Sequence, residues 1–340
     1  MNLSLVEKIA DAILYEGYIL YPYRPSAVKN QQRWNFGALC PESYSLAQKG
    51  AEAWSMQTEC LVNETPAPLL EVKVRFLQLM SREILDPDSR VVPSLEVNGR
   101  LFQTWQEAVE REVCVPLLNI RRAVSAHLPF TFFGNKQLEE LHDESNGNLA
   151  GQILRTQHTI EGLIEITATR VKSGLIKLCV NIKNLTGLDR AGEKSRDEAL
   201  LRSFVSTHTI LALREGRFVS LMDPPDVWRE AAAGCSNVGT YPVLVGEEGA
   251  LDCMLSSPII LYDYPQIASE SAGALFDGTE IDEILTLRIM TLTDEEKREM
   301  RSGDARAREI LERTEMLPQE HLLKMHGAMR SPQRSTKVTK

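Results

Sequence analysis

Apolar positions near the start of the chain recur with helical spacing. They lie three and four residues apart, which places them on one face of a helix. They are Leu3, Val6, Ile9, Ala10, Ile13 and Leu14. The pattern predicts an amphipathic helix over residues 4–16 that ends near Gly17, since glycine commonly follows the last helical turn.

Between about residue 55 and residue 265 the pattern changes to an alternation of apolar and polar positions, which is typical of strands with one buried face. Residues 163–170 and 176–182 alternate most clearly and predict an antiparallel hairpin. Asn98-Gly99, between LEV and RLF, predicts a second hairpin with a two-residue turn. A third is expected where FVSTHTILAL and FVSLMD flank residues 214–217.

The remaining extended pieces of this region are YPVLVG, SSPIILYDY and LPFTFF, and the preceding WQEAVEREV predicts a helix between residues 103 and 125. Many short strands separated by turn residues favour an antiparallel β-sandwich or a barrel-like core. With helices at both ends, the expected fold class is α+β.

The pattern becomes helical again from residue 277. Thr293 followed by Glu296 forms a capping box, which marks a helix start. Residues 329–340 are polar, basic and unpatterned, which is typical of a disordered tail. The expected organisation is an N-terminal helix and loop (1–54), a β-rich core (55–276), a C-terminal helical segment (277–328) and the tail.

Composition narrows the function classes. The 340 residues carry a net charge of −9, with a pI near 5.4, which argues against a broad nucleic-acid footprint. No apolar run reaches the length of about 18 residues that predicts a membrane span. The six cysteines are scattered without metal-ligand spacing. We therefore expect a cytoplasmic protein with free thiols.

One stretch stands out as a candidate binding site: YPYRPSAVKNQQRWNFG, residues 21–37, here called the basic-aromatic segment. Its cations, amides and aromatics suit partner contact, and three readings are open: pairing with acids of the same chain, contact with a protein partner, and binding of an anionic ligand. The candidate partner-binding residues are Tyr21, Tyr23, Arg24, Lys29, Asn30, Arg33 and Trp34. Asp223 and Asp263, each near a proline, are the expected acids if the arginines pair internally.

Other chemistry is weaker. Asp277, Glu280 and Asp282 form an acidic cluster whose oxygens could hold a hard cation, although acids in a first helical turn also stabilise the helix dipole. His142 lies in a polar loop, and His208 lies within a strand pattern, where a buried structural role is the expected one. No phosphate-binding loop or nucleophile elbow occurs, so cofactors are not specified.

The chain resembles an uncharacterised family of bacterial proteins encoded beside uptake nickel–iron hydrogenase genes. The resemblance runs from about residue 5 to residue 328. The segments that carry it are YEGYILYPYRPSAVKNQQRWNFG, FVSTHTIL with FVSLMDPP, CSNVGTYPVLVG, and MLSSPIILYDYPQIASES with LFDGTEIDEILTLRIMTLTDEEKREM. It implies an accessory or maturation role and supplies no catalytic residue.

The sequence therefore predicts a non-catalytic accessory protein that binds a protein partner. The expected setting is assembly or maturation of a nickel–iron hydrogenase or a related metalloenzyme, and the expected partner is a hydrogenase subunit or an assembly factor. The alternative is a metal carrier or metal-dependent enzyme that uses the acidic cluster at residues 277–283.

Overall fold

The computed structural model describes most of the β-rich region and parts of both ends of the chain. The described residues are 3–14, 36–63, 67–121, 124–265, 289, 292–302, 308, 311–312 and 314–316. Nearly all of the basic-aromatic segment and the whole acidic cluster at residues 277–283 lie outside these ranges.

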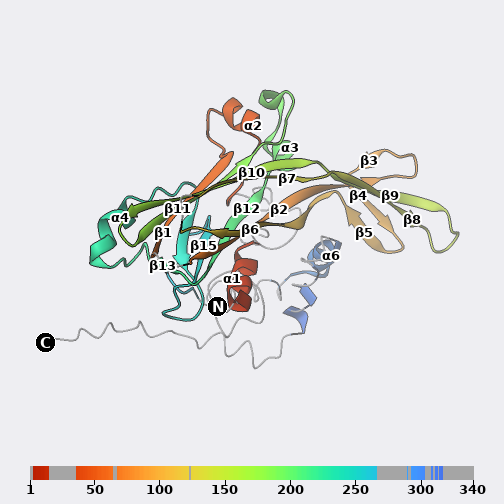
Figure 1. Cartoon of the computed structure of the whole chain (residues 1–340). Coiled ribbons are helices and arrows are strands. Elements are labelled where there is room, and N and C mark those ends of the chain that lie inside the picture. Colours follow the sequence, from red (N-terminus) through yellow and green to blue (C-terminus); the bar gives the residue numbers. More distant parts are fainter. Residues whose placement is uncertain are drawn as a thin grey trace.

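Strands dominate the described chain (Figure 1). The helices are α1 (Leu3–Leu14), α2 (Glu42–Ala47), α3 (Arg196–Leu200), α4 (Arg229–Ala233) and α6 (Asp294–Ser302), with short 3-10 turns η2 (Ala191–Glu193) and η3 (Asp226–Trp228). The strands are β1 (Ser55–Asn63), β2 (Leu69–Leu85), β3 (Val91–Val92), β4 (Ser94–Val97), β5 (Arg100–Gln103), β6 (Trp105–Asn119), β7 (Val124–Phe132), β8 (Asn135–His142), β9 (Leu149–Gln157), β10 (Ile160–Lys172), β11 (Leu175–Asn184), β12 (Val205–Arg214), β13 (Arg217–Val219), β14 (Tyr241–Leu244) and β15 (Cys253–Ser257).

The strands form two large antiparallel sheets and one small hairpin. The first sheet has the order β13-β1-β11-β10-β7. The second has the order β14-β15-β12-β2-β9-β8, with β6 and β3 also paired to β2. β2 pairs with β12 over residues 69–77 and continues far enough to pair with β9. The extension carries β8 and β9 out as an arm, on which the β4–β5 hairpin packs (Figure 1).

Both large sheets contribute to one apolar core, because the alternating strand positions face inward. Val72, Val74 and Phe76 of β2 meet Ile164 and Ile166 of β10 in this core. The predicted β-rich, antiparallel character is confirmed, and the sheets do not close into a barrel.

Helix α1 lies against the outer face of the second sheet. Its apolar stripe, with Ile9 and Ile13, packs against Ile210 and other residues of β12, β14 and β15. Ion pairs fix one side of the helix to β2, since Glu7 lies 3.2 Å from Lys73 and Asp11 2.7 Å from Arg75. The predicted N-terminal helix is confirmed over Leu3–Leu14.

Several local predictions are confirmed. The hairpin of 163–170 with 176–182 is β10–β11. Asn98-Gly99 turns between β4 and β5, with φ of 53° and 72°. In the C-terminal region, Thr293 and Glu296 form the predicted capping box before α6. The other predicted C-terminal helices fall largely outside the described residues.

The predicted helix over WQEAVEREV is wrong. These residues belong to β6, which pairs with β2 from Trp105 to Val115 without interruption. Charged residues of high helix propensity misled the prediction. Side-chain packing against a long neighbouring strand decided the conformation, because strand preference depends mostly on context.

Two other predictions need correction. Residues 214–217 do not close a hairpin, since β12 belongs to the second sheet and β13 pairs with β1 in the first. The strand predicted over SSPIILYDY ends at Ser257. Pro258 follows it, and a proline cannot donate a hydrogen bond to a neighbouring strand.

Candidate functional site

The chain just before the basic-aromatic segment and the chain at its C-terminal end both contact one place in β12, where the strand pairing is irregular. The pairing of β12 with β2 shifts between Val205 and His208, and Ser206 there has a φ of 53°. Its hydroxyl donates to the carbonyl of Ile13, at the end of α1, over 3.0 Å. Its backbone N–H donates to the carbonyl of Phe36 over 3.1 Å. One residue therefore holds the chain before the segment and the chain at its end.

Gly37, the last residue of the basic-aromatic segment, strengthens this attachment. Its carbonyl accepts from the N–H of Thr207 over 3.0 Å. Its φ is 55°, and a Cβ there would lie 2.7 Å from the ring of Pro258. Glycine is thus required by both conformation and space. The candidate partner-binding residues Tyr21 to Trp34 lie outside the described part, and their role stays a prediction.

His208 follows this irregularity and is fully buried beneath α1. One ring nitrogen, Nδ1, lies 2.9 Å from the carbonyl of Ser206, and Nε2 has no hydrogen-bond partner. Burial lowers the pKa of the imidazole to about 4, with a further lowering from the nearby Arg75 guanidinium. The ring is therefore neutral at physiological pH. The sequence predicts a histidine within a strand whose ring nitrogens both have partners; the ring does lie in β12, but only Nδ1 has a partner among the described residues.

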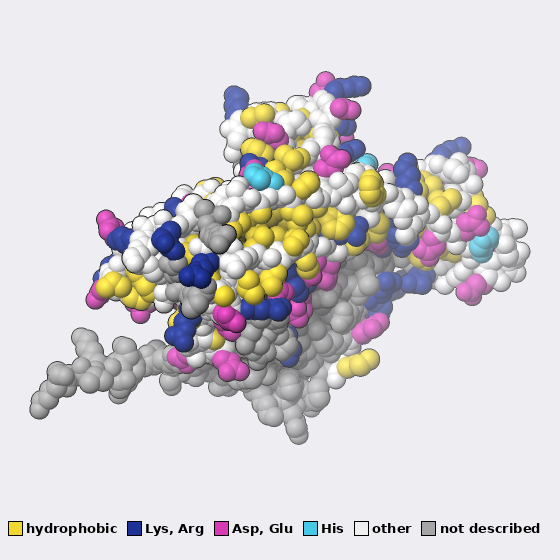
Figure 2. Space-filling view, in the orientation of Figure 1, with side chains coloured by type: hydrophobic (Ala, Val, Ile, Leu, Met, Phe, Trp, Pro, Cys, Tyr) yellow, Lys and Arg dark blue, Asp and Glu magenta, His cyan; other side chains and the backbone are white. Residues whose placement is uncertain are grey.

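An apolar surface lies where the two sheets end side by side, at β6 and β7. Val115 of β6 is buried in the common core, but most other inward-facing apolar residues of the two strands pack against this core and remain partly buried. We call this set the apolar strip: Val113, Leu118, Val124, Ala126, Leu128, Phe130 and Phe132. Figure 2 shows hydrophobic side chains gathered across the middle of the face between β6 and β7. Apolar side chains gathered on a surface can mark an interaction site, so the strip is a candidate binding face.

One end of the apolar strip adjoins the base of the basic-aromatic segment. Phe204, which exchanges two backbone hydrogen bonds with Leu39, stacks on Phe76 at a centroid distance of 4.7 Å. It also lies 5.4 Å from the ring of Phe130. Gly162 makes room for this aromatic cluster, because a Cβ there would lie 2.3 Å from the Phe130 ring. The strip and the base of the segment thus share one rigid support.

Arg111 closes the strip at the same end. Its guanidinium carbon lies 4.8 Å from the centroid of the Phe132 ring, a geometry typical of cation–π contact. Its Nε donates to Gln78 over 2.8 Å.

The two aspartates expected to pair with Arg24 and Arg33 lie in neighbouring turns. Ser220 links them, because its hydroxyl donates to Asp263 and accepts from the N–H of Asp223 at 2.9 Å. Asp263 also accepts from the N–H of Leu244 over 2.8 Å. The contacts that stabilise the turns thus use the carboxylate of Asp263 and the backbone N–H of Asp223. The arginines lie outside the described residues.

Within the described part of the chain, no group of three or more histidine, cysteine, aspartate or glutamate side chains is placed to hold a metal ion. The candidate metal ligands Asp277, Glu280 and Asp282 lie outside it. His142 is exposed at the end of β8 and pairs with Glu140 over 3.2 Å.

All six cysteines are free thiols, and Cys40, Cys60 and Cys253 are buried. Burial raises the pKa of Cys253 to about 12 and that of Cys235 to about 11. Both thiols are therefore protonated at neutral pH, which argues against a nucleophilic role.

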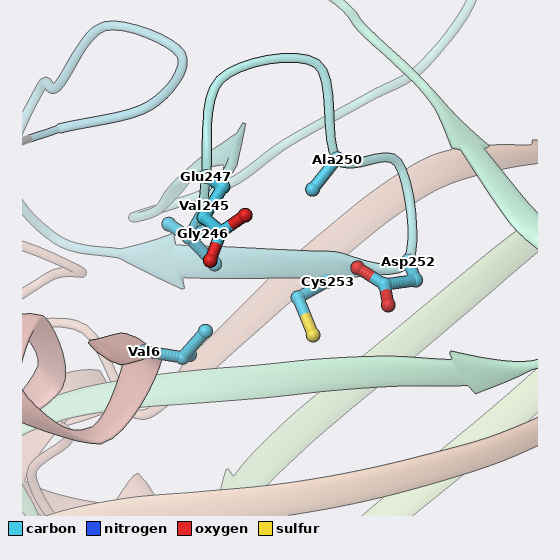
Figure 3. A pocket seen from close by; sticks show the side chains of 7 residues that line it. All are labelled: Val6, Val245, Gly246, Glu247, Ala250, Asp252 and Cys253. Carbon is cyan, nitrogen blue, oxygen red and sulfur yellow. The ribbon is translucent and has the colours of Figure 1, made fainter. Parts of the chain in front are cut away.

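A hollow of about 280 Å³ lies between the start of α1 and the loop that joins β14 to β15. It is lined by Val6, Val245, Gly246, Glu247, Ala250, Asp252 and Cys253 (Figure 3). Its two carboxylates would repel an anionic ligand, and its protonated thiol is a poor nucleophile. We assign no function to this hollow.

The sequence did not reveal the apolar strip. Alternation over LPFTFF predicts the extended conformation of β7 correctly. Nothing in the alternation indicates that β7 and β6 are both edge strands, since edge position depends on the pairing of distant segments. In the described residues, no helix has the length and apolar character needed to cross a membrane.

Comparisons with known proteins add little. No family model matches the chain, and no curated protein matches it. Among solved structures, the chain is similar at 11% identity to the Salmonella SPI-1 type III secretion injectisome secretin InvG (residues 176-end) in the open gate state. The match covers 63% of this chain and 60% of that chain, with a TM-score of 0.11. A similarity at this level supports no conclusion about fold or function.

Proposed function

We propose that this protein is a non-catalytic accessory protein that binds a protein partner. The apolar strip between β6 and β7 is the observation that carries the proposal. We interpret the two sheets as the layers of an open β-sandwich, in which the inward-facing side chains of both edge strands stay partly uncovered. Covering them by a partner removes apolar surface from water, which favours association by about 25 cal/mol per Å².

The strip has the features of an interface centre. Phenylalanine and arginine are both enriched at protein interfaces, and arginine is also a common hot-spot residue. The base of the basic-aromatic segment adjoins it through Phe204. This position supports the hypothesis that Tyr23, Arg24 and Trp34 contribute to the same contact.

The proposed setting is assembly or maturation of a nickel–iron hydrogenase or a related metalloenzyme, with a hydrogenase subunit or assembly factor as the partner. This setting rests on the family resemblance.

A pull-down from the native host tests the proposal. The tagged wild-type protein should recover a specific partner, identified by mass spectrometry. Leu128→Glu, which places a charge in the strip, should lose that partner. Leu138→Glu is the matched control, because Leu138 lies on β8, is 56% exposed and is remote from the strip. Equal recovery by a folded Leu128→Glu variant would refute the proposal.

A further inference from the structure

The shape of the apolar strip restricts what can cover it. The inward-facing residues of β7 run from Val124 to Phe132, a length of about 27 Å at the usual rise of a strand. Strands β6 and β7 belong to different sheets and, in the described part of the chain, pair only with β2 and β10 respectively. Sheets packed face to face lie about 10 Å apart. The strip is therefore a long, narrow seam between two strand edges.

Prolines make both edges poor sites for an added strand. In an antiparallel pair, a residue directs its backbone groups either toward the partner strand or away from it. Pro129 is opposite Leu163 and has no N–H, so it fits β7 only with its backbone directed to the free edge. The middle of that edge therefore lacks a donor. On β6, Pro116 lies where the register with β2 shifts. Prolines and bulges at edges are known devices against strand addition.

An α-helix matches the seam better than a strand does. A helix is about 10 Å wide with its side chains, and about 18 residues span 27 Å. Its backbone hydrogen bonds are internal, so it needs no donors from either edge. We propose that the apolar strip binds an amphipathic helix of the partner protein. This inference rests on the proposed partner-binding function and specifies its chemistry.

Charges beside the strip favour a helix with basic residues on one flank. Glu110 and Glu112 lie on the outer face of β6, with side chains 48% and 42% exposed. Arg75 and Lys73 are near them but also pair with Asp11 and Glu7 on α1. In the ion pairs of the described residues, these four carboxylates share two cations, while Arg111, also on β6, lies over Phe132 at one end of the strip.

The rim along β7 is different. Its outward-facing residues include Ser125, His127 and Thr131, and His127 lies 3.5 Å from Glu165. This side has less negative charge to attract a partner. The asymmetry predicts that lysines or arginines of the bound helix lie along β6.

Two synthetic peptides of identical composition test the proposal. The helical probe has about 18 residues, with leucines spaced three and four apart and lysines along one flank. The extended probe has leucines and lysines in strict alternation. Binding of each fluorescent peptide to the full-length protein is measured by anisotropy. We expect the helical probe to bind at least about tenfold more tightly than the extended probe, since each 1.4 kcal/mol changes affinity tenfold.

Variants locate the binding. Leu128→Glu should weaken binding of the helical probe at least about tenfold, and Leu138→Glu should leave it unchanged. Ala126→Gln adds bulk to the strip without removing a core side chain, and it should weaken binding even if Leu128→Glu fails to fold. Circular dichroism confirms the fold of each variant.

The outcomes separate this inference from the proposed function. Tighter binding of the extended probe would refute the proposal that the strip binds a helix, but not the proposal that it binds a partner. The same holds if neither probe binds while partner recovery in the pull-down still depends on the strip. Light scattering could instead show a dimer that Leu128→Glu abolishes. The strip would then bind a second copy of the chain, which would also refute the proposal of a partner helix. Strip-independent partner recovery would refute the proposed function itself.

Discussion

Protonation of His208 should make the protein less stable as the pH falls. The ring is fully buried, and its pKa of about 4 lies below the ordinary histidine value of 6.5. Below pH 6.5 the unfolded chain binds a proton that the folded protein excludes, so the free energy of unfolding decreases with pH. The decrease is complete below pH 4. The shift corresponds to about 3 kcal/mol in full, and to about 2 kcal/mol between pH 7.5 and pH 5.

Urea unfolding followed by tryptophan fluorescence across pH 7.5 to 5 measures this effect. The variant His208→Asn keeps an N–H donor for the Ser206 carbonyl and removes the titrating ring. Its free energy of unfolding should therefore vary with pH by about 2 kcal/mol less than that of the wild type.

The control is His142→Gln, on the exposed end of β8, which should retain the wild-type pH dependence. The comparison uses the change with pH in each protein, so a constant loss of packing in His208→Asn does not affect it. Parallel pH profiles for the wild type and His208→Asn would show that the buried ring does not control acid stability.

Three further substitutions test the packing around the proposed binding surface. Gly162→Ala should lower the free energy of unfolding by about 1–3 kcal/mol in urea titrations, because the ring of Phe130 must move. Gly187→Ala, in open space, should change it little, and equal effects of the two variants would contradict this expectation. Glu107→Gln should lower the free energy of unfolding by about 3 kcal/mol in the same assay, because its carboxylate pairs with the buried Arg82 and with Arg155, each over 3.0 Å. Wild-type stability of this variant would exclude an important ion pair. Gly37→Ala should lower the free energy of unfolding by about 1–2 kcal/mol, because Gly37 has a positive φ and lies close to Pro258. It should also reduce partner recovery, and full recovery would show that the base of the segment does not contribute to binding.

Local patterns in the sequence predicted the elements whose conformation depends on near neighbours. The apolar spacing of α1, the turn at Asn98-Gly99 and the alternation in β10 and β11 each fix a backbone through residues a few positions apart. The box of Thr293 and Glu296 is equally local. Such features stay the same whatever the rest of the chain does, so the sequence alone determines them.

Only the tertiary structure decided the features that depend on distant pairing. WQEAVEREV became β6 because β2 offered a long edge, and residues on either side of 214–217 entered different sheets. The apolar strip arises because β6 and β7 are both edge strands of sheets that share a core. Ser206, at the irregularity of β12, bonds to Ile13 of α1, which precedes it by nearly 200 residues, and also to Phe36 at the end of the basic-aromatic segment. The sequence by itself determined where chain segments turn, alternate or coil, and the tertiary contacts determined which apolar faces remained partly uncovered.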